Sequence, residues 1–314
     1  MKIMVVGVGA LGSLFGGGLS SAGHDVTLLI RNLAHREAIR SDGLTLYLDD
    51  RVVKARPHVV NSESASEAGV ADLILVFTKT GSTRAALAAT RHVIGPQTRL
   101  VSLQNGLGNA DVLAEFVPIE RVIYGTTIAP ADLTEPGAVT SHGKRLSQFR
   151  AAGDDAVTAD MADHLADMLN TAGLEAVVNP DVDAVIWGKV AFNCAMNSLC
   201  ALLHLTPGPL LDSAELFSLV IDVTDEVADV AAACGVVVDR EALRQTLDMV
   251  HRQHRDHRPS MLVDVMAGRR TEIDSLNGAV AALGQQRGVL TPRTQTLLAL
   301  VHAYESNYLG REGG

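Results

Sequence analysis

Residues 2–12, KIMVVGVGALG, decide the fold of the first half of the chain. A short run of β-favouring residues, KIMVV, is followed at once by Gly7, Gly9 and Gly12 in G-x-G-x-x-G spacing. The spacing alone is a weak signal. Here a strand pattern precedes it and a helical pattern follows from about Ala10 to Ala22, which is the context of a dinucleotide-binding turn.

In such a turn the first glycine permits the tight bend, the second lets a pyrophosphate approach, and the third lets helix and strand pack closely. The N-terminus of the following helix then faces the phosphates. We therefore predict that a dinucleotide binds at Gly7, Gly9, Ala10, Leu11 and Gly12. The alternative is a glycine-rich turn with a purely structural role.

The end of the second predicted strand, residues 25–30, indicates which dinucleotide binds. NAD-binding domains usually carry Asp or Glu there to hold the ribose 2′-hydroxyl. This chain has Arg31 instead. A carboxylate would repel a 2′-phosphate, whereas arginine pairs with it through charge-assisted hydrogen bonds. The sequence therefore favours NADP(H), with Arg31 at the 2′-phosphate; a solvated surface arginine is the alternative.

Strand and helix patterns alternate through the first half of the chain and then stop. This β-α-β rhythm predicts a mainly parallel, doubly wound sheet. After Pro180 only helical periodicity is present, from about residue 184 to 308. We predict an α/β domain over residues 1–180 and an all-α domain over residues 181–314. The expected strands are residues 2–6, 25–30, 44–48, 52–60, 72–77, 99–104, 121–128, 137–141, 146–151 and 174–179, with a turn at Asp49-Asp50 and a disordered tail in the final GREGG.

Charge and composition exclude some classes of function. The net charge is −10, whereas a nucleic-acid-binding protein usually has a basic face. The N-terminus does not resemble a signal peptide, and no charge-free run reaches the ~20 residues that span a bilayer. The three cysteines lack the spacing of metal ligands. We expect a cytoplasmic protein that has buried free thiols, no metal site, and no membrane or nucleic-acid partner.

Two further loops follow predicted strands. Lys79 comes after residues 72–77, and Asn105 comes after residues 99–104, with Gly106 and Gly108 beside it. Ligands of open parallel sheets bind outside the carboxyl ends of the strands. Both loops are therefore expected near the cofactor, although a simple turn explains each of them equally well.

An apolar helical stretch in the second half, WGKVAFNCAMN at residues 187–197, carries three polar side chains. Lys189, Asn193 and Asn197 fall at i, i+4 and i+8 and so share one face of the helix. A helix that is apolar nearly all round should be buried. A buried ammonium needs a carboxylate or a wet cleft, so this face either lines a site or closes a structural hydrogen-bond network.

A second polar segment, RRTEIDSLNG at residues 269–278, follows later in the chain. Thr271 and Asp274 have the spacing of a capping box, and Ile273, Leu276 and Val280 mark the buried face of the helix that it would start. The pattern gives Glu272 no structural role. Just upstream, Ser260 and Asp264 stand at i and i+4.

These segments together resemble the ketopantoate reductases (2-dehydropantoate 2-reductases) over nearly the whole chain. The resemblance rests on the ordered set GVGALG, the TK at Lys79, QNGLG, WGKVAFNCAMNSL, SMLVDV and TEIDSLNG. It implies a Rossmann domain followed by a helical domain. It also implies NADPH-dependent reduction of the ketone of 2-dehydropantoate to pantoate, a step of pantothenate biosynthesis.

The resemblance also implies residue roles. It makes Lys189 the general acid and Glu272 a catalytic carboxylate near a substrate hydroxyl and the cofactor. Asn193 and Asn197 would hold the substrate, and Ser260 its carboxylate. Lys79 and Asn105 would line the nicotinamide and substrate crevice, and Arg31 would bind the 2′-phosphate.

One departure from the family concerns the substrate. Some members follow the asparagine-bearing helix with a Pro-Asn-Gly-Glu-Leu turn, whereas this chain has TPGPL, with Pro207 where the amide would be. Three alternatives therefore stay open: a reductase of another 2-oxo acid, a β-hydroxyacid or imine reductase, and a non-catalytic NADP(H) sensor. The apolar helices of the second half also suggest a homodimer.

Overall fold

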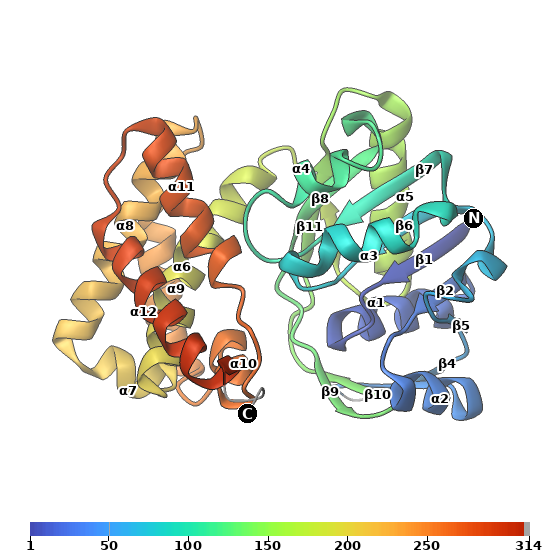
Figure 1. Cartoon of the computed structure of the whole chain (residues 1–314), viewed down its shortest axis with the longest axis horizontal. Coiled ribbons are helices and arrows are strands. Elements are labelled where there is room, and N and C mark those ends of the chain that lie inside the picture. The colour runs from blue at the N-terminus through green and yellow to red at the C-terminus, as the bar shows by residue number, and fades with distance from the viewer. Residues whose placement is uncertain (50, 311–314) are drawn as a thin grey trace. The chain divides into compact units, whose positions relative to one another are not determined.

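The chain forms two compact units, as the computed structural model shows for residues 1–49 and 51–310 (Figure 1). The first unit comprises Met1–Gln104 and Asn109–Val182, and the second comprises Asn105–Gly108 and the chain from Asp183 onward. The short segment at residues 105–108 therefore belongs to the second unit although it lies in the middle of the first in sequence. Asp50, half of the predicted turn, and residues 311–314 of the predicted tail lie outside the described residues.

The first unit is built on a doubly wound sheet, as the sequence predicts. Its strand order is β12-β11-β8-β7-β6-β1-β2-β5, and every neighbouring pair is parallel except β8 and β11. The strands are β1 Lys2–Val6, β2 Asp25–Leu29, β5 His58–Val60, β6 Ala71–Val76, β7 Ile94–Ser102, β8 Val122–Thr127, β11 Ser147–Ala151 and β12 Ala176–Val178.

Helices cover both faces of this sheet. One apolar core joins the sheet to α1 and α5, with Phe15 and Leu165 among its buried members. A second core joins the opposite face to α3 and α4, with Leu87 and Leu113 buried. The helices of this unit are α1 Ala10–Ser21, α2 Leu33–Asp42, α3 Thr83–Ala89, α4 Asn109–Ala114 and α5 Ala156–Thr171.

A second, four-stranded sheet corrects the sequence prediction. The prediction placed residues 137–141 in the main sheet, but they form β10, which pairs with β3 and β9. The physical reason is that α1 is buried on all sides. The face of α1 that points away from the main sheet must therefore pack against another element, and the second sheet is that element. A Cβ on Gly17 of α1 would lie 2.8 Å from Leu46 of this sheet. The strands are β3 Leu44–Leu48, β4 Arg51–Ala55, β9 Asp132–Glu135 and β10 Ala138–Ser141, in the order β4-β3-β10-β9.

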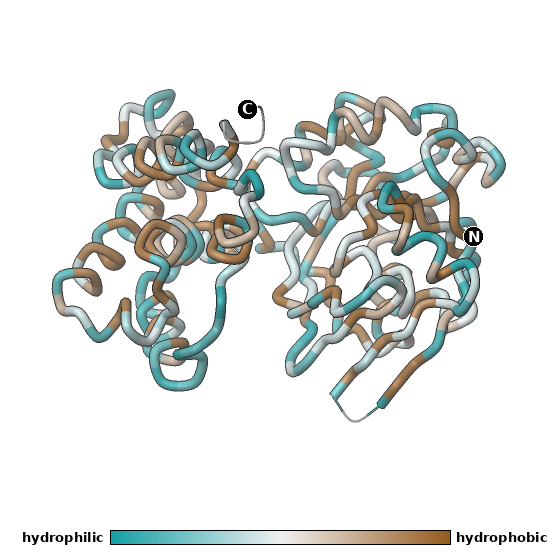
Figure 2. The backbone as a smooth tube through the Cα atoms, turned by 60° about the horizontal axis from the view of Figure 1, so that its bottom comes forward, coloured by the Kyte–Doolittle hydropathy of each residue, from teal (hydrophilic) through white to brown (hydrophobic). Residues whose placement is uncertain are grey.

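The second unit is helical, and its described residues contain no strand. Hydrophobic and hydrophilic stretches alternate along its helices (Figure 2). Its core is formed largely by α6, whose residues Val190, Ala191 and Cys194 are fully buried. The helices are α6 Val182–Leu203, α7 Pro207–Asp212, α8 Ala214–Ala233, α9 Arg240–Gln253, α10 Ser260–Met266, α11 Asn277–Arg287 and α12 Pro292–Leu309, with a 3₁₀ turn, η5, at Ile273–Ser275.

Helix α6 is also long and apolar enough to cross a membrane, by length and composition alone, and no other helix of the described residues is. However, 61% of its most apolar window is buried inside the structure. The core helix of a folded domain has the same properties, and burial of this kind is what the apolar pattern of residues 187–197 predicts.

Candidate active site

The glycine-rich turn joins the carboxyl end of β1 to α1. Gly7 has φ +91°, and a Cβ there would overlap the backbone of Phe77 and Thr78 on the neighbouring strand end. A Cβ on Gly12 would overlap the carbonyl oxygen of Gly7. Glycine is therefore required at both positions, by the positive φ at Gly7 and by the close approach of helix to strand at Gly12.

Gly9 differs from these two glycines because a side chain there would point into open space. It is exposed, and a Cβ built on it would meet no atom within 4 Å. It is also the N-cap residue of α1, whose first turn carries no acidic residue. A helix N-terminus that has no acidic residue in its first turn suits a phosphate. The residues present thus fit a pyrophosphate at this turn.

Arg31 lies at the end of β2, directly before the next helix. Its side chain is exposed, and Asn32 after it is the N-cap of α2. The Asn32 side-chain oxygen accepts a hydrogen bond from the backbone N–H of His35 at 2.9 Å. An exposed guanidinium next to a capped helix N-terminus is a chemically suitable place for a phosphate.

The ends of β6 and β7 are linked by a buried glutamine that the sequence analysis missed. The Gln104 amide nitrogen donates to the Thr78 carbonyl and to Thr83 Oγ1, and its oxygen accepts from Ser102 Oγ at 2.8 Å. This network fixes the loop that carries Lys79, whose own side chain is exposed. The only signal for this role in the sequence was a glutamine directly before Asn105. The sequence does not show which groups this glutamine binds, because its partners are up to 26 residues away.

In the second unit, the Asn105–Gly108 loop is attached to the segment that follows Glu272. The backbone N–H of Leu107 donates to the Ser275 carbonyl at 3.1 Å. Gly106 has φ +88°, and a Cβ there would overlap the same carbonyl. The structure therefore brings the predicted residue Asn105 into the same unit as Lys189 and Glu272.

The polar stripe of α6 is largely buried. Asn193 and Asn197 are 8% and 5% exposed, and Lys189 is partly buried. Burial lowers the pKa of the Lys189 ammonium from 10.5 to about 8, and the Glu272 carboxylate acts against this by raising the pKa. Lys189 and Glu272 are thus an interacting pair, and this amine can exchange a proton near neutral pH.

The predicted capping box at Thr271 is wrong. Asp274 accepts a hydrogen bond from His302 at 2.8 Å, and the Thr271 N–H donates to Glu305 at 2.6 Å. A 3₁₀ turn follows Glu272, and α11 begins only at Asn277. Thr271 Oγ1 accepts from the nearby Ile273 N–H at 3.3 Å, but Asp274 and the Thr271 N–H have their partners on α12 and so do not complete the box. The predicted buried face is confirmed, since Ile273, Leu276 and Val280 are all at most 2% exposed.

A fully buried asparagine ties this segment to α6. Asn277 is 0% exposed, and its amide nitrogen donates to the Cys194 carbonyl at 3.1 Å. Cys194 directly follows Asn193 in α6 and belongs to the apolar core. Asn277 therefore helps to fix where Glu272 lies relative to α6, a role that the sequence analysis missed.

The remaining predicted positions lie elsewhere in the helical unit. Ser260 is the exposed first residue of α10, and Asp264 of that helix pairs with Arg269 at 2.9 Å. Pro207 is the buried first residue of α7, a position that suits proline because its missing N–H would have no helical partner.

The cysteines agree with the prediction of free thiols. Cys194 and Cys200 are buried and Cys234 is partly buried, and none of them is in a disulfide. Burial raises the pKa of Cys200 to about 12. The described residues contain no cluster of three or more His, Cys, Asp or Glu side chains that could hold a metal ion.

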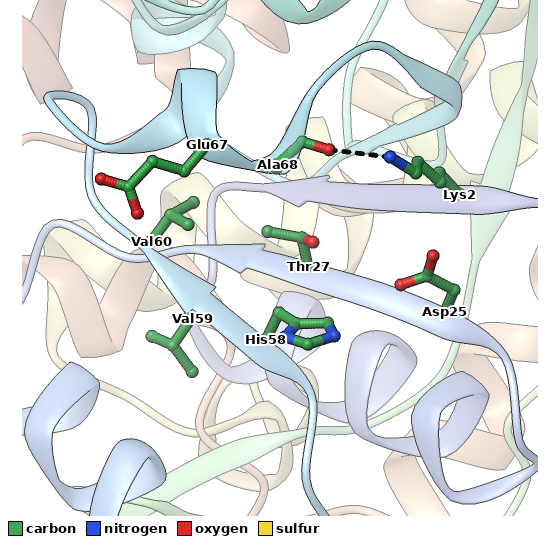
Figure 3. Close-up of a pocket in the computed structure, with 8 residues that line it drawn as sticks. All are labelled: Lys2, Asp25, Thr27, His58, Val59, Val60, Glu67 and Ala68. Carbon is green, nitrogen blue, oxygen red and sulfur yellow. Dashed lines mark hydrogen bonds between the residues drawn. The ribbon is translucent and has the colours of Figure 1, made fainter.

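A polar pocket of about 370 Å³ lies beside β1, β2 and β5 of the main sheet (Figure 3). It is near the amino ends of β1 and β2, whereas the glycine-rich turn follows the carboxyl end of β1. Lys2 Nζ donates across it to the Ala68 carbonyl at 3.4 Å. Its lining contains none of the predicted site residues: Lys2, Asp25, Thr27, His58, Val59, Val60, Glu67 and Ala68.

Two family models match the chain in succession. Residues 3–154 match the model described as ketopantoate reductase PanE/ApbA. Residues 181–305 match the model of the C-terminal part of the same family. Together they cover most of both units.

Individual relatives agree over the full length. A 2-dehydropantoate 2-reductase from Streptococcus pyogenes serotype M6 is 34% identical over 307 residues, which are 98% of each chain. A solved structure of D-mandelate dehydrogenase with NADH and anilino(oxo)acetate has a TM-score of 0.91 at 31% identity, covering 98% of this chain and 99% of that one. The structure of a PanE/ApbA family ketopantoate reductase from Ralstonia eutropha JMP134 has a TM-score of 0.88 at 28% identity, covering 98% of this chain and 100% of that one.

Proposed function

The chain belongs to the ketopantoate reductase family, and on this premise we propose that it reduces the ketone of 2-dehydropantoate to pantoate with NADPH. It is an oxidoreductase that uses a nicotinamide cofactor.

Lys189 is the proton donor of the proposed reaction. The nicotinamide, when bound, supplies a hydride to the carbonyl carbon. Negative charge then develops on the substrate oxygen and must be neutralised as it forms. An ordinary lysine is a weak acid at neutral pH, but a pKa of about 8 brings Lys189 close to the optimum for proton transfer. The position of Lys189 on the largely buried polar stripe of α6, within the influence of the Glu272 carboxylate, is the observation that carries the proposal.

Glu272 has two tasks in this account. Its charge raises the pKa of Lys189, so more of the amine stays protonated at neutral pH than burial alone would allow. Its oxygens would also accept a hydrogen bond from a substrate hydroxyl. A site built in this way rejects analogues that lack the hydroxyl, because the carboxylate is then left unpaired.

The amides and the hydroxyl serve to orient the substrate. Asn193 and Asn197 are neutral, so they hold an oxo acid without changing the charge balance around Lys189. Ser260 would bind the substrate carboxylate. Lys79 and Asn105 would line the crevice, Lys79 adding a positive charge that suits an anionic substrate.

The cofactor is assigned to the first unit. Gly7, Gly9, Ala10, Leu11 and Gly12 would hold the pyrophosphate, and Arg31 the 2′-phosphate. The exposed side chain of Arg31 and the absence of a carboxylate at this position support NADPH over NADH. The solved structure of the similar D-mandelate dehydrogenase contains NADH.

A second candidate function is reduction of a different 2-oxo acid, such as one with an aryl group. Two observations favour it: the structural likeness to a D-mandelate dehydrogenase, and Pro207 in place of an amide of some family members. A panel of 2-oxo acids, assayed by nicotinamide absorbance with NADPH and with NADH, separates the two. The proposal requires the highest kcat/KM with 2-dehydropantoate and NADPH; a higher value with phenylglyoxylate would replace it by the alternative.

The β-hydroxyacid reductase and sensor alternatives give different results in the same assays. The first would oxidise 3-hydroxyacids with NADP, and the second would bind NADP(H) with no turnover. A homodimer and a cytoplasmic location stay predictions. Sedimentation velocity tests the first, since one chain has a mass of 33.1 kDa.

A further inference from the structure

A buried histidine in the first unit makes two hydrogen bonds through its ring. His35 is 1% exposed. Its Nδ1 accepts from the backbone N–H of Gly137 at 3.0 Å, so Nδ1 is unprotonated and the ring hydrogen must be on Nε2. Nε2 then donates to Ser13 Oγ, also at 3.0 Å. A single neutral tautomer of His35 can therefore make both hydrogen bonds. Any rotation of the ring would break them.

These bonds join three elements around the predicted cofactor site. Ser13 lies on α1, one residue after Gly12 of the glycine-rich turn. His35 lies in the first turn of α2, three residues after its N-cap Asn32 and four after Arg31. Gly137 is in the turn between β9 and β10, beside which α2 lies (Figure 1).

Helix α2 has few other attachments. Of its ten residues only His35 and Ile39 are buried. The glycine-rich turn, in contrast, is fixed by the close contacts of Gly7 and Gly12 with backbone atoms and does not depend on α2. Loss of the His35 bonds should therefore move the start of α2 relative to the glycine-rich turn, while the turn itself stays in place.

We propose that His35 is a positioning residue for NADPH, which sets the distance between the pyrophosphate-binding turn and Arg31. This inference rests on the proposed role of Arg31 at the 2′-phosphate. An arginine–phosphate pair depends on geometry, so a shift of the α2 start weakens it. NADH has no 2′-phosphate, so its affinity is nearly independent of His35. His35 therefore contributes to the preference for NADPH without touching the cofactor.

The experiment measures the Kd of NADPH and of NADH for the full chain by nicotinamide fluorescence, without substrate. His35→Leu and Ser13→Ala should each raise the Kd of NADPH, His35→Leu by about tenfold, with the Kd of NADH changed less than about twofold. His35→Gln retains a donor and an acceptor and should restore much of the ratio. In an Arg31→Ala background, His35→Leu should leave the ratio of the two Kd values unchanged.

Thr98→Val is the matched control. Thr98 is 1% exposed, and its Oγ1 donates to the Ala71 carbonyl and accepts from the Gly95 N–H at the opposite edge of the sheet. The variant should lose thermal stability, as His35→Leu does, but keep the wild-type ratio of the two Kd values. A general loss of stability is thereby separated from a positioning effect.

The outcomes are distinct. If His35→Leu and Ser13→Ala both leave the NADPH-to-NADH ratio of Kd values at the wild-type figure, the inference is overturned while the proposed function stands. If His35→Leu does not fold, the ratio for Ser13→Ala decides. If the wild-type protein binds NADH as tightly as NADPH, the proposed cofactor preference fails and the role of His35 fails with it.

Discussion

The backbone N–H of Leu107 donates a hydrogen bond to the carbonyl of Ser275, 3.1 Å away. These residues are 168 positions apart in the sequence, yet the bond joins the loop of Asn105 to the segment of Glu272. Two segments with predicted site residues are thus held as one piece of the helical unit. The local geometry of this loop is therefore expected to control activity.

Gly106→Ala tests this expectation. The substitution introduces strain at φ +88° and a clash with the Ser275 carbonyl, so it should destabilise the loop and reduce kcat/KM more than tenfold. Gly108→Ala is the matched control, because Gly108 also has positive φ (+77°) but a Cβ there meets open space. Equal losses of kcat/KM in the two variants would show that backbone strain alone, and not the Ser275 contact, is responsible.

The burial of Lys189 predicts a conflict between activity and stability. Its pKa is about 8 in the folded protein and 10.5 in an exposed lysine, so the unfolded chain binds more protons between these pH values. The free energy of unfolding should therefore rise with pH over this window. Lys189→Met removes the desolvated charge and should be more stable than wild type below pH 8, by up to roughly 3 kcal/mol, with the difference shrinking towards pH 10.5.

Urea unfolding of both proteins at pH 7 and pH 10 provides the check. The difference in unfolding free energy should be larger at pH 7. A Lys189→Met variant that is less stable than wild type at pH 7 would indicate that the ammonium is well paired in the native state and contributes to folding.

His35 predicts a second pH effect on stability, of separate origin. Burial lowers its pKa below 6.5 in the folded protein. The unfolded chain therefore takes up a proton first as the pH falls, and the stability that His35 contributes above pH 6.5 is lost as the pH passes through its lower, folded pKa. His35→Gln cannot titrate there and should show a flatter dependence of unfolding free energy between pH 7 and pH 5. A parallel dependence in the two proteins would assign the acid sensitivity to other groups.

Most of the first unit could be predicted from the sequence because its signals are local. The turn at Gly7 and the apolar strand at residues 72–77 are local patterns, and both are present in the structure. The four-stranded sheet could not be assigned, since the pairing of β3 with β10 joins residues about 90 positions apart. The burial of α1 on all sides, which requires this second layer, is known only from the structure.

In the candidate site, too, local patterns could be predicted from the sequence and contacts between distant segments could not. The stripe of Lys189, Asn193 and Asn197 follows from helical spacing alone. The capping box failed because Asp274 has a tertiary partner, His302, that no local pattern reveals. Gln104, Asn277 and His35 were missed for the same reason: each is a buried polar residue whose hydrogen-bond partners come from distant segments.

The central claim is that Lys189 donates the proton to the reduced carbonyl, and the pH dependence of kcat/KM tests it most directly. For the wild-type protein with its best 2-oxo acid and NADPH, the account predicts a plateau near neutral pH and a tenfold fall per pH unit above about 8. Lys189→Ala should lower kcat/KM roughly 10²- to 10⁴-fold at pH 7, with that break absent and with unchanged affinity for NADPH. A wild-type profile that stays flat to pH 10, or a Lys189→Ala enzyme with near wild-type kcat/KM, would contradict the claim.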